Sequence, residues 1–396
     1  MRGRGGGPSN LPNKKSKYAE AGVDVKKKGI EIFKTTIHNL HPEAFCVITE
    51  DPDFPGYGLV THADSAGSKP IQAYLNWKES GNLDWFKGLA QDVIAMNLND
   101  IACIGAKPVN FVDYVALNPF KVPKTDLLRV LNEGFKECLK TLEQLGSRIL
   151  FSGGETADLP DMLRTLDISG VVNGRVNLSK AVTGAKIKAG DVIVGMRSGG
   201  KTKYEKRENS GIMCNGLTLA RHCLMSREYQ ERYPEIVDPQ SNGYFGRFKF
   251  DDYIDVLGMT VGEALLSPMR FYAPIILKIL EEYEGYVSGL VHNMGGGLTK
   301  GLRIGKNIHY VKDDLFKPDP IFELIKNESG ENWSAMYEIY NMGVGFEVIA
   351  KPEVAEDIIS LSESYGLESK VIGRCEKSDG ENKVTIISAH GKFQYS

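Results

Sequence analysis

Residues 149–157 read Ile149-Leu150-Phe151-Ser152-Gly153-Gly154-Glu155-Thr156-Ala157, and the fold can be worked out from this stretch. Three apolar residues indicate a strand. The glycine pair that follows indicates backbone that approaches a ligand closely, because glycine has no Cβ to clash. A carboxylate at that point suits a metal ion or a proton better than a phosphate. The alternative is an ordinary turn at the end of a strand, carrying a solvated glutamate.

Strand-like and helix-like segments alternate around this stretch, which predicts an α/β or α+β fold with two cores. In the first half we expect strands at 58–63, 109–116 and 162–176, and helices at 89–105 and 126–145. In the second half we expect a turn and a strand within 189–195, a strand at 285–292, and helices at 268–283 and 352–365. A boundary near 173–179 divides the chain into an N-terminal domain, 18–175, and a C-terminal domain, 176–396. The polar and aromatic stretch 227–258 is predicted to be an insertion.

Composition excludes several classes of protein. The net charge of −3 gives no electrostatic case for nucleic-acid or membrane binding, and no apolar run approaches the ~20 residues of a membrane span. The six cysteines form no Cys-x-x-Cys pair, which argues against a zinc site and a disulfide framework and favours a reducing cytoplasm. Residues 1–17 are predicted to be a flexible Gly-rich, basic tail. The alternative is an arm that folds over a bound phosphate.

Two segments of the N-terminal half carry acids in patterns that suggest metal and phosphate binding. The loop 64–69, Asp-Ser-Ala-Gly-Ser-Lys, could hold a metal through Asp64 and a phosphate through Lys69 and backbone N–H groups, although a surface turn is the alternative. On the helix that follows, Asp92 and Asn99 are seven residues apart and share nearly one face, and Asp100 lies about 80° further round. Carboxylates on a mostly buried helix are costly unless they are paired or metal-bound. The alternative is that Asp92 stabilises the helix dipole from the N-terminal end of the helix, and that Asp100 is an ordinary acid exposed to solvent.

A fifth acid lies within an apolar strand. Asp113 is flanked by Phe111-Val112 and Tyr114-Val115, a setting in which an acid usually points into a site or an ion pair. Together with the acids at 64, 92, 100 and 155 it forms a set of hard oxygen ligands, which Mg²⁺ with nucleotide phosphates requires. No histidine–cysteine cluster favours a softer metal instead.

The C-terminal half contributes glycine-bearing segments beside polar side chains. Asn215-Gly216 follows a polar loop, and His292 ends a strand just before Gly295-Gly296-Gly297, where backbone N–H groups could bind an anion. His292 could be a general acid or base, a phosphate contact, or a structural histidine. Asn341-Met342-Gly343-Val344-Gly345 is a further glycine-bearing strand.

Taken in order, these segments resemble the aminoimidazole ribonucleotide synthetase family, also called phosphoribosylformylglycinamidine cyclo-ligase. The resemblance covers nearly the whole chain apart from the tail and the insertion, and the ordered set is specific although each motif alone is weak. It is carried by 18–24 (YAEAGVD), 64–69, 92–100, 105–108 (GAKP), 111–114, 153–157 with Met162, 190–192, 215–216, 266–270 (LSPMR), His292 with 295–297, and Met336-Tyr337 with 341–345.

The resemblance implies a two-domain architecture, in which the N-terminal domain binds ATP and its sheet forms a shared barrel in a homodimer. The C-terminal domain is then an α/β sandwich on the substrate side. The implied activity is ATP-dependent ring closure of formylglycinamidine ribonucleotide to aminoimidazole ribonucleotide in purine biosynthesis, with magnesium.

The resemblance also implies roles for individual residues. ATP is expected at Asp64, Gly67, Ser68, Lys69, Asp92, Asn99, Asp100, Asp113 and Glu155, and metal at Asp64, Asp92, Asp100 and Glu155. The ribonucleotide is expected at Thr156, Asn215, Gly216, Gly295, Gly296, Gly297 and Asn341. His292 and Lys69 are the expected catalytic residues.

Some positions depart from the pattern of the resembled family. Met213 stands where the family usually has a histidine, Cys214 replaces a serine, and the 64–69 loop differs from the usual Asp-Gly-Val-Gly-Thr-Lys. Asn293-Met294 also precedes the triple glycine where the family has an apolar residue and a threonine. Two alternatives therefore stay open: another ATP-dependent phosphoryl-transfer enzyme of the same superfamily, and a catalytically silent relative that binds nucleotides.

Overall fold

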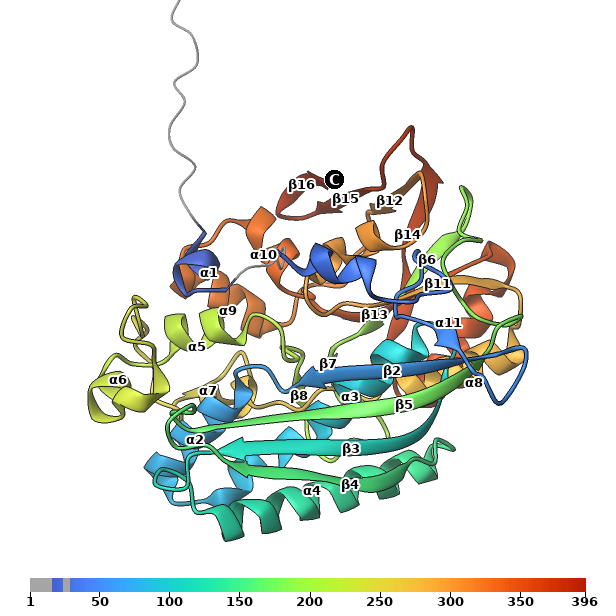
Figure 1. Cartoon of the computed structure of the whole chain (residues 1–396). Coiled ribbons are helices and arrows are strands. Elements are labelled where there is room, and N and C mark those ends of the chain that lie inside the picture. Colours follow the sequence, from blue (N-terminus) through green and yellow to red (C-terminus); the bar gives the residue numbers. More distant parts are fainter. Residues whose placement is uncertain (1–15, 24–28) are drawn as a thin grey trace, which may run out of the picture.

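The computed structural model describes residues 16–23 and 29–396, and the predicted N-terminal tail lies almost entirely outside these ranges. The chain folds around two sheets, with mixed helix and strand in both halves (Figure 1). No helix of the described residues is long and apolar enough to cross a membrane.

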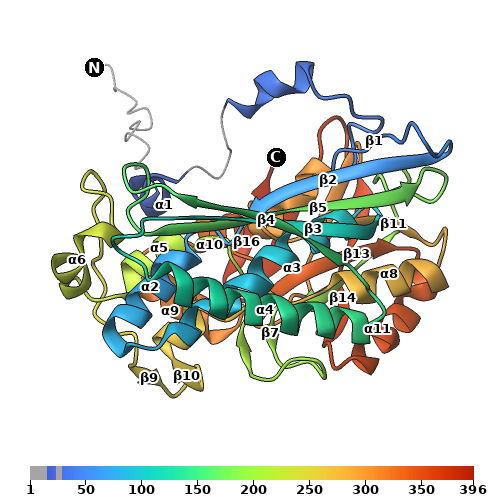
Figure 2. The same ribbon diagram turned by 60° about the horizontal axis from the view of Figure 1, so that its bottom comes forward.

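The N-terminal sheet has five strands in the order β1-β2-β5-β3-β4, in which only β3 and β4 run parallel. The strands are β1 (Thr49–Glu50), β2 (Tyr57–Ser65), β3 (Lys107–Leu117), β4 (Leu150–Asp158) and β5 (Leu166–Asn177). The helices of this half are α1 (Lys17–Glu20), α2 (Lys69–Ser80), α3 (Gly88–Ala102) and α4 (Lys124–Gln144). Figure 2 shows α3 and α4 together on one side of this sheet.

The two faces of the N-terminal sheet differ in burial because side chains alternate along a strand. In β5 every second residue from Leu166 to Val176 is buried beneath the helices, and the residues between them are half-exposed. On the same open face Tyr114 of β3 and Leu150 of β4 are 37% and 52% exposed. One face of the sheet is therefore covered by helices, and the other carries apolar side chains in contact with solvent.

The stretch 153–157 lies within a strand and is not the turn that the glycine pair suggested. All five residues belong to β4, which is the edge strand beside β3. A bulge sets Asp113 opposite Gly154, where a Cβ would lie 1.9 Å from the Asp113 carboxylate. The glycine at 154 is thus required by its neighbouring strand.

The C-terminal sheet has seven strands in the order β11-β13-β6-β14-β12-β15-β16, in which only β12 and β15 run parallel. They are β6 (Val192–Arg197), β11 (Val287–His292), β12 (Ile308–Lys312), β13 (Val344–Ala350), β14 (Ser369–Lys377), β15 (Lys383–Ser388) and β16 (Gly391–Tyr395). The helices of this half include α5 (Leu217–Leu224), α7 (Val261–Leu265), α8 (Ala273–Glu282), α9 (Pro320–Ser329), α10 (Trp333–Ile339) and α11 (Ala355–Ser364). Every residue of the edge strand β11 and of its neighbour β13 is buried, so this end of the sheet is covered.

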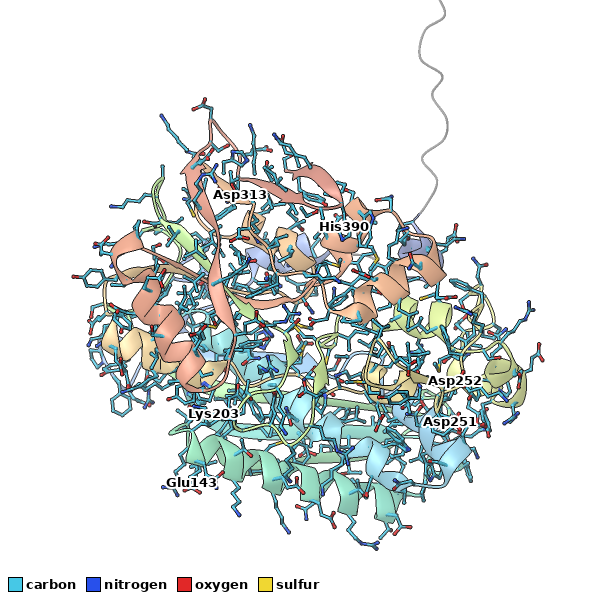
Figure 3. The ribbon with its side chains drawn as sticks, turned by 180° about the vertical axis from the view of Figure 1, so that it is seen from behind. Glu143, Lys203, Asp251, Asp252, Asp313 and His390 are labelled. Carbon is cyan, nitrogen blue, oxygen red and sulfur yellow. The ribbon has the colours of Figure 1, made fainter. Side chains whose placement is uncertain are left out.

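The predicted insertion forms a peripheral unit of short elements. It contains α6 (Glu228–Arg232) and the small hairpin of β9 (Tyr253–Ile254) and β10 (Met259–Thr260). Figure 3 shows Asp251 and Asp252, just before this hairpin, in the right-hand part of the view. Salt bridges from Arg232 to Glu79 and from Arg164 to Asp238 attach the unit to the N-terminal half.

The predicted helices and strands are confirmed, but several begin later than expected, and the largest shifts are in β5 and α8. The strand expected from 162 begins at Leu166, because the N–H groups of Met162 and Leu163 both donate to Leu159 O in a turn. The helix expected from 268 begins at Ala273. Before it, the Arg270 side chain is buried against Glu205 and the carbonyls of Arg197, Gly199 and Gly200, which holds this segment away from the helix.

Candidate functional site

Several of the predicted motifs meet at a pocket of about 390 Å³ between the two halves of the chain. Asp64 and Gly67 of the β2–α2 loop and Asp100 of α3 come from the N-terminal half, whereas Asn215 and Gly295 come from the C-terminal half. The other lining residues are Ala44, Phe45, His62, Ala63, Ser65, Met96, Cys214, Met294, Lys300 and Arg303. A larger pocket of about 520 Å³, beside α1, α5 and α9, is lined by none of the predicted site residues.

Asp64 lies near the end of β2, where the strand passes into the loop before α2. One of its carboxylate oxygens, Oδ1, accepts a hydrogen bond of 2.8 Å from Ser65 N–H. Gly67 has φ +60°, and a Cβ there would lie 3.3 Å from Cys214 O, so glycine allows this loop to approach the C-terminal half closely. The loop therefore presents a carboxylate and backbone groups to the pocket.

Asp100 accepts hydrogen bonds from two histidines of different elements. His292 Nδ1 lies 2.6 Å from Asp100 Oδ1, and His62 Nε2 lies 3.3 Å from Oδ2. Burial would raise the pKa of Asp100, but the hydrogen bonds from His292 and His62 hold it well below its usual range. Asp100 is therefore a carboxylate at neutral pH, with 11% of its side chain exposed at the pocket.

Of the two histidines, only His62 lines the pocket, and His292 is fully buried behind Asp100. Asn97 Nδ2 donates to Val93 O at 2.9 Å, which leaves Asn97 Oδ1 to accept from His62 Nδ1 at 2.9 Å. Burial would lower the pKa of His62, but the hydrogen bond to Asp100 outweighs it and the pKa rises to about 9. His62 is thus held as an imidazolium at neutral pH, whereas the predicted catalytic His292 reaches the pocket only through Asp100.

The structure places Lys69 in the interior, outside the lining of the pocket. Its Nζ lies 2.6 Å from Asp92 Oδ1 and 2.6 Å from Ser267 O, and both side chains of the pair are buried. Asp92 Oδ1 also accepts from Met269 N–H at 2.8 Å. This ion pair joins the N-terminal helices to the Ser267–Arg270 segment, and Lys69 does not line the pocket, so its contact with a phosphate stays a prediction. Ser68, just before it, hydrogen-bonds through its hydroxyl to Thr218 at 3.0 Å.

Two further predicted residues hold the backbone between elements. Asn99 Oδ1 accepts from the N–H groups of Tyr272 and Ala273 at 2.9 and 3.0 Å, where α8 begins. Asn341 donates to Gly211 O at 2.8 Å and accepts from Ser198 Oγ at 2.8 Å. Both asparagines are buried and neither lines the pocket. Their contacts with a nucleotide and a ribonucleotide, respectively, stay predictions.

The acids of the β3–β4 side lie apart from the pocket. Glu155 pairs with Tyr114 on the open face of the sheet, whereas Asp64 lies two strands beyond β3, on β2. Asp113 lies beside Gly154, and burial raises its pKa. Within residues 16–23 and 29–396 no group of three or more His, Cys, Asp or Glu side chains could share a metal ion. The predicted four-acid set is therefore not assembled within one chain, and the roles of Asp113, Glu155 and Thr156 stay predictions.

The glycines predicted at the substrate side are required by close packing. Gly216 has φ +73°, and a Cβ there would lie 2.3 Å from the Tyr340 ring. Gly297 has φ +50°, and a Cβ there would lie 2.4 Å from Tyr340 O. Gly295 is open to the pocket, with Asn215 Oδ1 3.9 Å from the position of a Cβ. Only Asn215 and Gly295 of this set line the pocket.

Sequence reasoning assigned no role to three charged residues that line the pocket: His62, Lys300 and Arg303. His62 could have been found from the period of two, since it lies two residues before Asp64 on the same face of β2. The two cations follow the triple glycine in the short 3₁₀ segment η4 (Gly297–Arg303), which carried no motif. Met213, the position that departs from the resembled family, has the left-handed φ of +60°, which is uncommon for methionine.

Comparison with known proteins gives concordant results at the level of families. Residues 44–176 match the family model described as AIR synthase related protein, N-terminal domain, and residues 188–385 match its C-terminal counterpart. Among curated proteins the chain is similar to those named phosphoribosylformylglycinamidine cyclo-ligase. That of Methanocaldococcus jannaschii is 35% identical over 85% of this chain and 83% of the relative. Those of Methanococcus vannielii and Pyrococcus horikoshii are 34% and 33% identical, over 95% and 93% of this chain and 98% and 97% of the relatives.

Solved structures show the same fold at low sequence identity. The HypE–HypF complex contains a chain that matches with a TM-score of 0.53 and 14% identity, over 92% of this chain and 98% of the other. T. maritima PurL complexed with FGAR matches with a TM-score of 0.52 and 14% identity, over 92% of this chain and 49% of the other.

Proposed function

Because this chain belongs to the aminoimidazole ribonucleotide synthetase family, we propose that it is a phosphoribosylformylglycinamidine cyclo-ligase of purine biosynthesis. It closes formylglycinamidine ribonucleotide to aminoimidazole ribonucleotide and converts ATP to ADP and phosphate. The observation that carries this proposal is the family match over both halves, together with near-full-length identity to curated cyclo-ligases. The pocket between the two halves is the proposed active site.

The reaction needs a better leaving group than an amide oxygen. Transfer of the γ-phosphoryl group of ATP to that oxygen makes an iminophosphate, and a nearby amidine nitrogen then attacks the carbon and expels phosphate. The chain itself provides positioning, because the pocket is built from both halves and brings two bound substrates together. Asp100, with His292 behind it, holds His62 as an imidazolium, and His62 is the group proposed to give up and regain a proton at the pocket. His292 then acts through Asp100 as a positioning residue.

The oxygen donors of the pocket are suited to magnesium. Asp64 and Asp100 both present carboxylates there, and Mg²⁺ typically uses one or two carboxylates together with substrate phosphates and water. This pair, and not the full predicted set with Asp92 and Glu155, is the proposed magnesium site. When bound, magnesium neutralises charge on the phosphates of ATP.

We further propose that the chain works as a homodimer in the cytoplasm. The open face of the N-terminal sheet carries Tyr114 and Leu150 toward solvent, and β4 is an unpaired edge, which is a surface that proteins tend to cover. A shared barrel between two copies would cover this face and bring Glu155 into an interface. All six cysteines are free and buried, as a reducing compartment allows. Light scattering coupled to size exclusion would test this assembly, and a strictly monomeric, active enzyme would contradict it.

The proposed function is tested by supplying the purified protein with formylglycinamidine ribonucleotide, ATP and magnesium, and assaying the aminoimidazole product. No product under conditions in which a known cyclo-ligase is active would refute it. Asp100→Asn should lower turnover by roughly 100-fold or more, since it removes a charged group from the reacting site. Asp379→Asn, at an exposed acid, is the matched control and should keep full activity.

A further inference from the structure

The pocket carries its charges in two groups that come from different halves of the chain. The acids Asp64 and Asp100 come from the N-terminal half together with the His62 imidazolium, so that this side keeps a net negative charge, and the cations Lys300 and Arg303 come from the C-terminal half. A phosphate can approach the acids only if a metal ion neutralises them, whereas it can approach the cations without one. The charge of the pocket thus favours separate places for a metal-bound phosphate chain and for a metal-free phosphate.

The two cations project from one face of a single short segment. Lys300 and Arg303 are three residues apart in the 3₁₀ segment η4, where side chains at i and i+3 eclipse one another. Lys300 Nζ lies 5.0 Å from the centre of the Phe45 ring, and Phe45 also lines the pocket. This contact restrains a long flexible side chain at the pocket wall, and Arg303 beside it is exposed.

Backbone groups of the preceding loop are available to the same ligand. The N–H groups of Gly295 and Gly296 form no hydrogen bond within the described part of the chain, although Gly297 N–H donates to Met294 O at 2.7 Å. Gly295 lines the pocket, and apart from its chain neighbours no atom of the described residues lies closer than 3.9 Å to the place where its Cβ would be. Asn215 Oδ1 is that nearest atom, so its amide lies at the same edge. Two N–H donors beside two cations are a suitable environment for phosphate oxygens.

We propose that Lys300 and Arg303, with the Gly295–Gly296 N–H groups, bind the phosphate monoester of the ribonucleotide substrate, and that Phe45 positions Lys300. This proposal rests on the proposed function. The phosphate that carries no metal then lies at the cations, and the triphosphate of ATP lies near Asp64 and Asp100. Lys300 and Arg303 are therefore specificity-determining residues for the phosphorylated substrate.

The test compares Lys300→Met and the double variant Lys300→Met/Arg303→Ala with wild type, and uses Lys306→Met, an exposed lysine outside the pocket, as the matched control. Lys300→Met should raise the KM for formylglycinamidine ribonucleotide by about 10- to 100-fold, and the double variant should raise it further, since each charge-assisted hydrogen bond contributes about one to two powers of ten in affinity. The KM for ATP should stay within about twofold. Phe45→Leu should raise the ribonucleotide KM in the same direction by a smaller factor, and should have no effect in the Lys300→Met background.

A second measurement keeps this inference separate from the proposed function. Ribose 5-phosphate, which has the phosphate but not the reacting group, is titrated into wild type and the double variant by calorimetry. Loss of binding in the double variant alone supports the site even if wild type makes no aminoimidazole product. Equal affinities, an unchanged ribonucleotide KM, or an increase confined to the KM for ATP would overturn the proposal. Circular dichroism and thermal melting establish that each variant is folded.

Discussion

Replacing Lys69 with methionine should unfold the protein more easily and should not act first on chemistry. Lys69 Nζ and Asp92 Oδ1 are 2.6 Å apart, and their side chains are 0% and 1% exposed. Burial would lower the pKa of Lys69, but the Asp92 carboxylate outweighs it and holds the pKa above its ordinary value, so the pair is ionic. Without Lys69 a buried carboxylate keeps only Met269 N–H and the Cys214 thiol as donors.

The cost follows from that uncompensated charge. Removing one partner of a buried ion pair destabilises a protein by about 3–5 kcal/mol, which for domains of this size lowers Tm by roughly 6–20 °C. Thermal melting and urea denaturation at one protein concentration measure the effect, with Lys140→Met, at an exposed lysine of α4, as the control. Lys69→Met/Asp92→Asn removes both charges and should recover the larger part of the loss.

The opposite result would restore the role that the sequence suggested for Lys69. If Lys69→Met melts like Lys140→Met and binds ATP much more weakly, its ammonium group contacts phosphate in the working enzyme. The reasoning from burial would then be wrong. A double variant no more stable than Lys69→Met would likewise show that the two charges are not coupled.

Three further outcomes follow from the structure. Burial, with Arg221 nearby, lowers the pKa of His222 from 6.5 to about 3. The folded state thus favours the neutral imidazole, and the stability that this contributes is complete above pH 6.5 and is lost as the pH falls toward 3. Between pH 6.5 and 5 this amounts to about 2 kcal/mol, and denaturation curves of His222→Gln should lack that part of the pH dependence. Gly297→Ala should destabilise the protein by about 1–3 kcal/mol more than Gly285→Ala does. Both glycines have positive φ, but only a Cβ at 297 would meet Tyr340 O. Equal melting curves of the two variants would contradict this. Asp64→Asn should raise the magnesium concentration for half-maximal turnover roughly tenfold or more, whereas Asp379→Asn should not, and an unchanged magnesium dependence would remove Asp64 from the metal site.

The helices and strands follow largely from local patterns in the sequence. The apolar spacing of 126–145 predicts the amphipathic helix found as α4, and the apolar run at 109–116 predicts β3. The resemblance assigned Asp64, Asp100, Asn215 and Gly295 to ligands, and all four line the pocket. The helices and strands could be predicted because periodicity is a property of the chain itself.

The partners of each charged side chain were decided by tertiary structure. Lys69, Asp92 and Asn99 carry the residue types of a nucleotide site, yet they link elements in the interior, because their partners Ser267, Met269 and Tyr272 are more than 170 residues away in sequence. Glu155 lies on the open face of its sheet because a bulge in the β3–β4 pairing sets the register of β4. His62, Lys300 and Arg303 reach the pocket only through the packing of the two halves. A sequence thus determines which chemistry is available, whereas long-range packing decides which groups face a ligand, since that depends on contacts between distant segments.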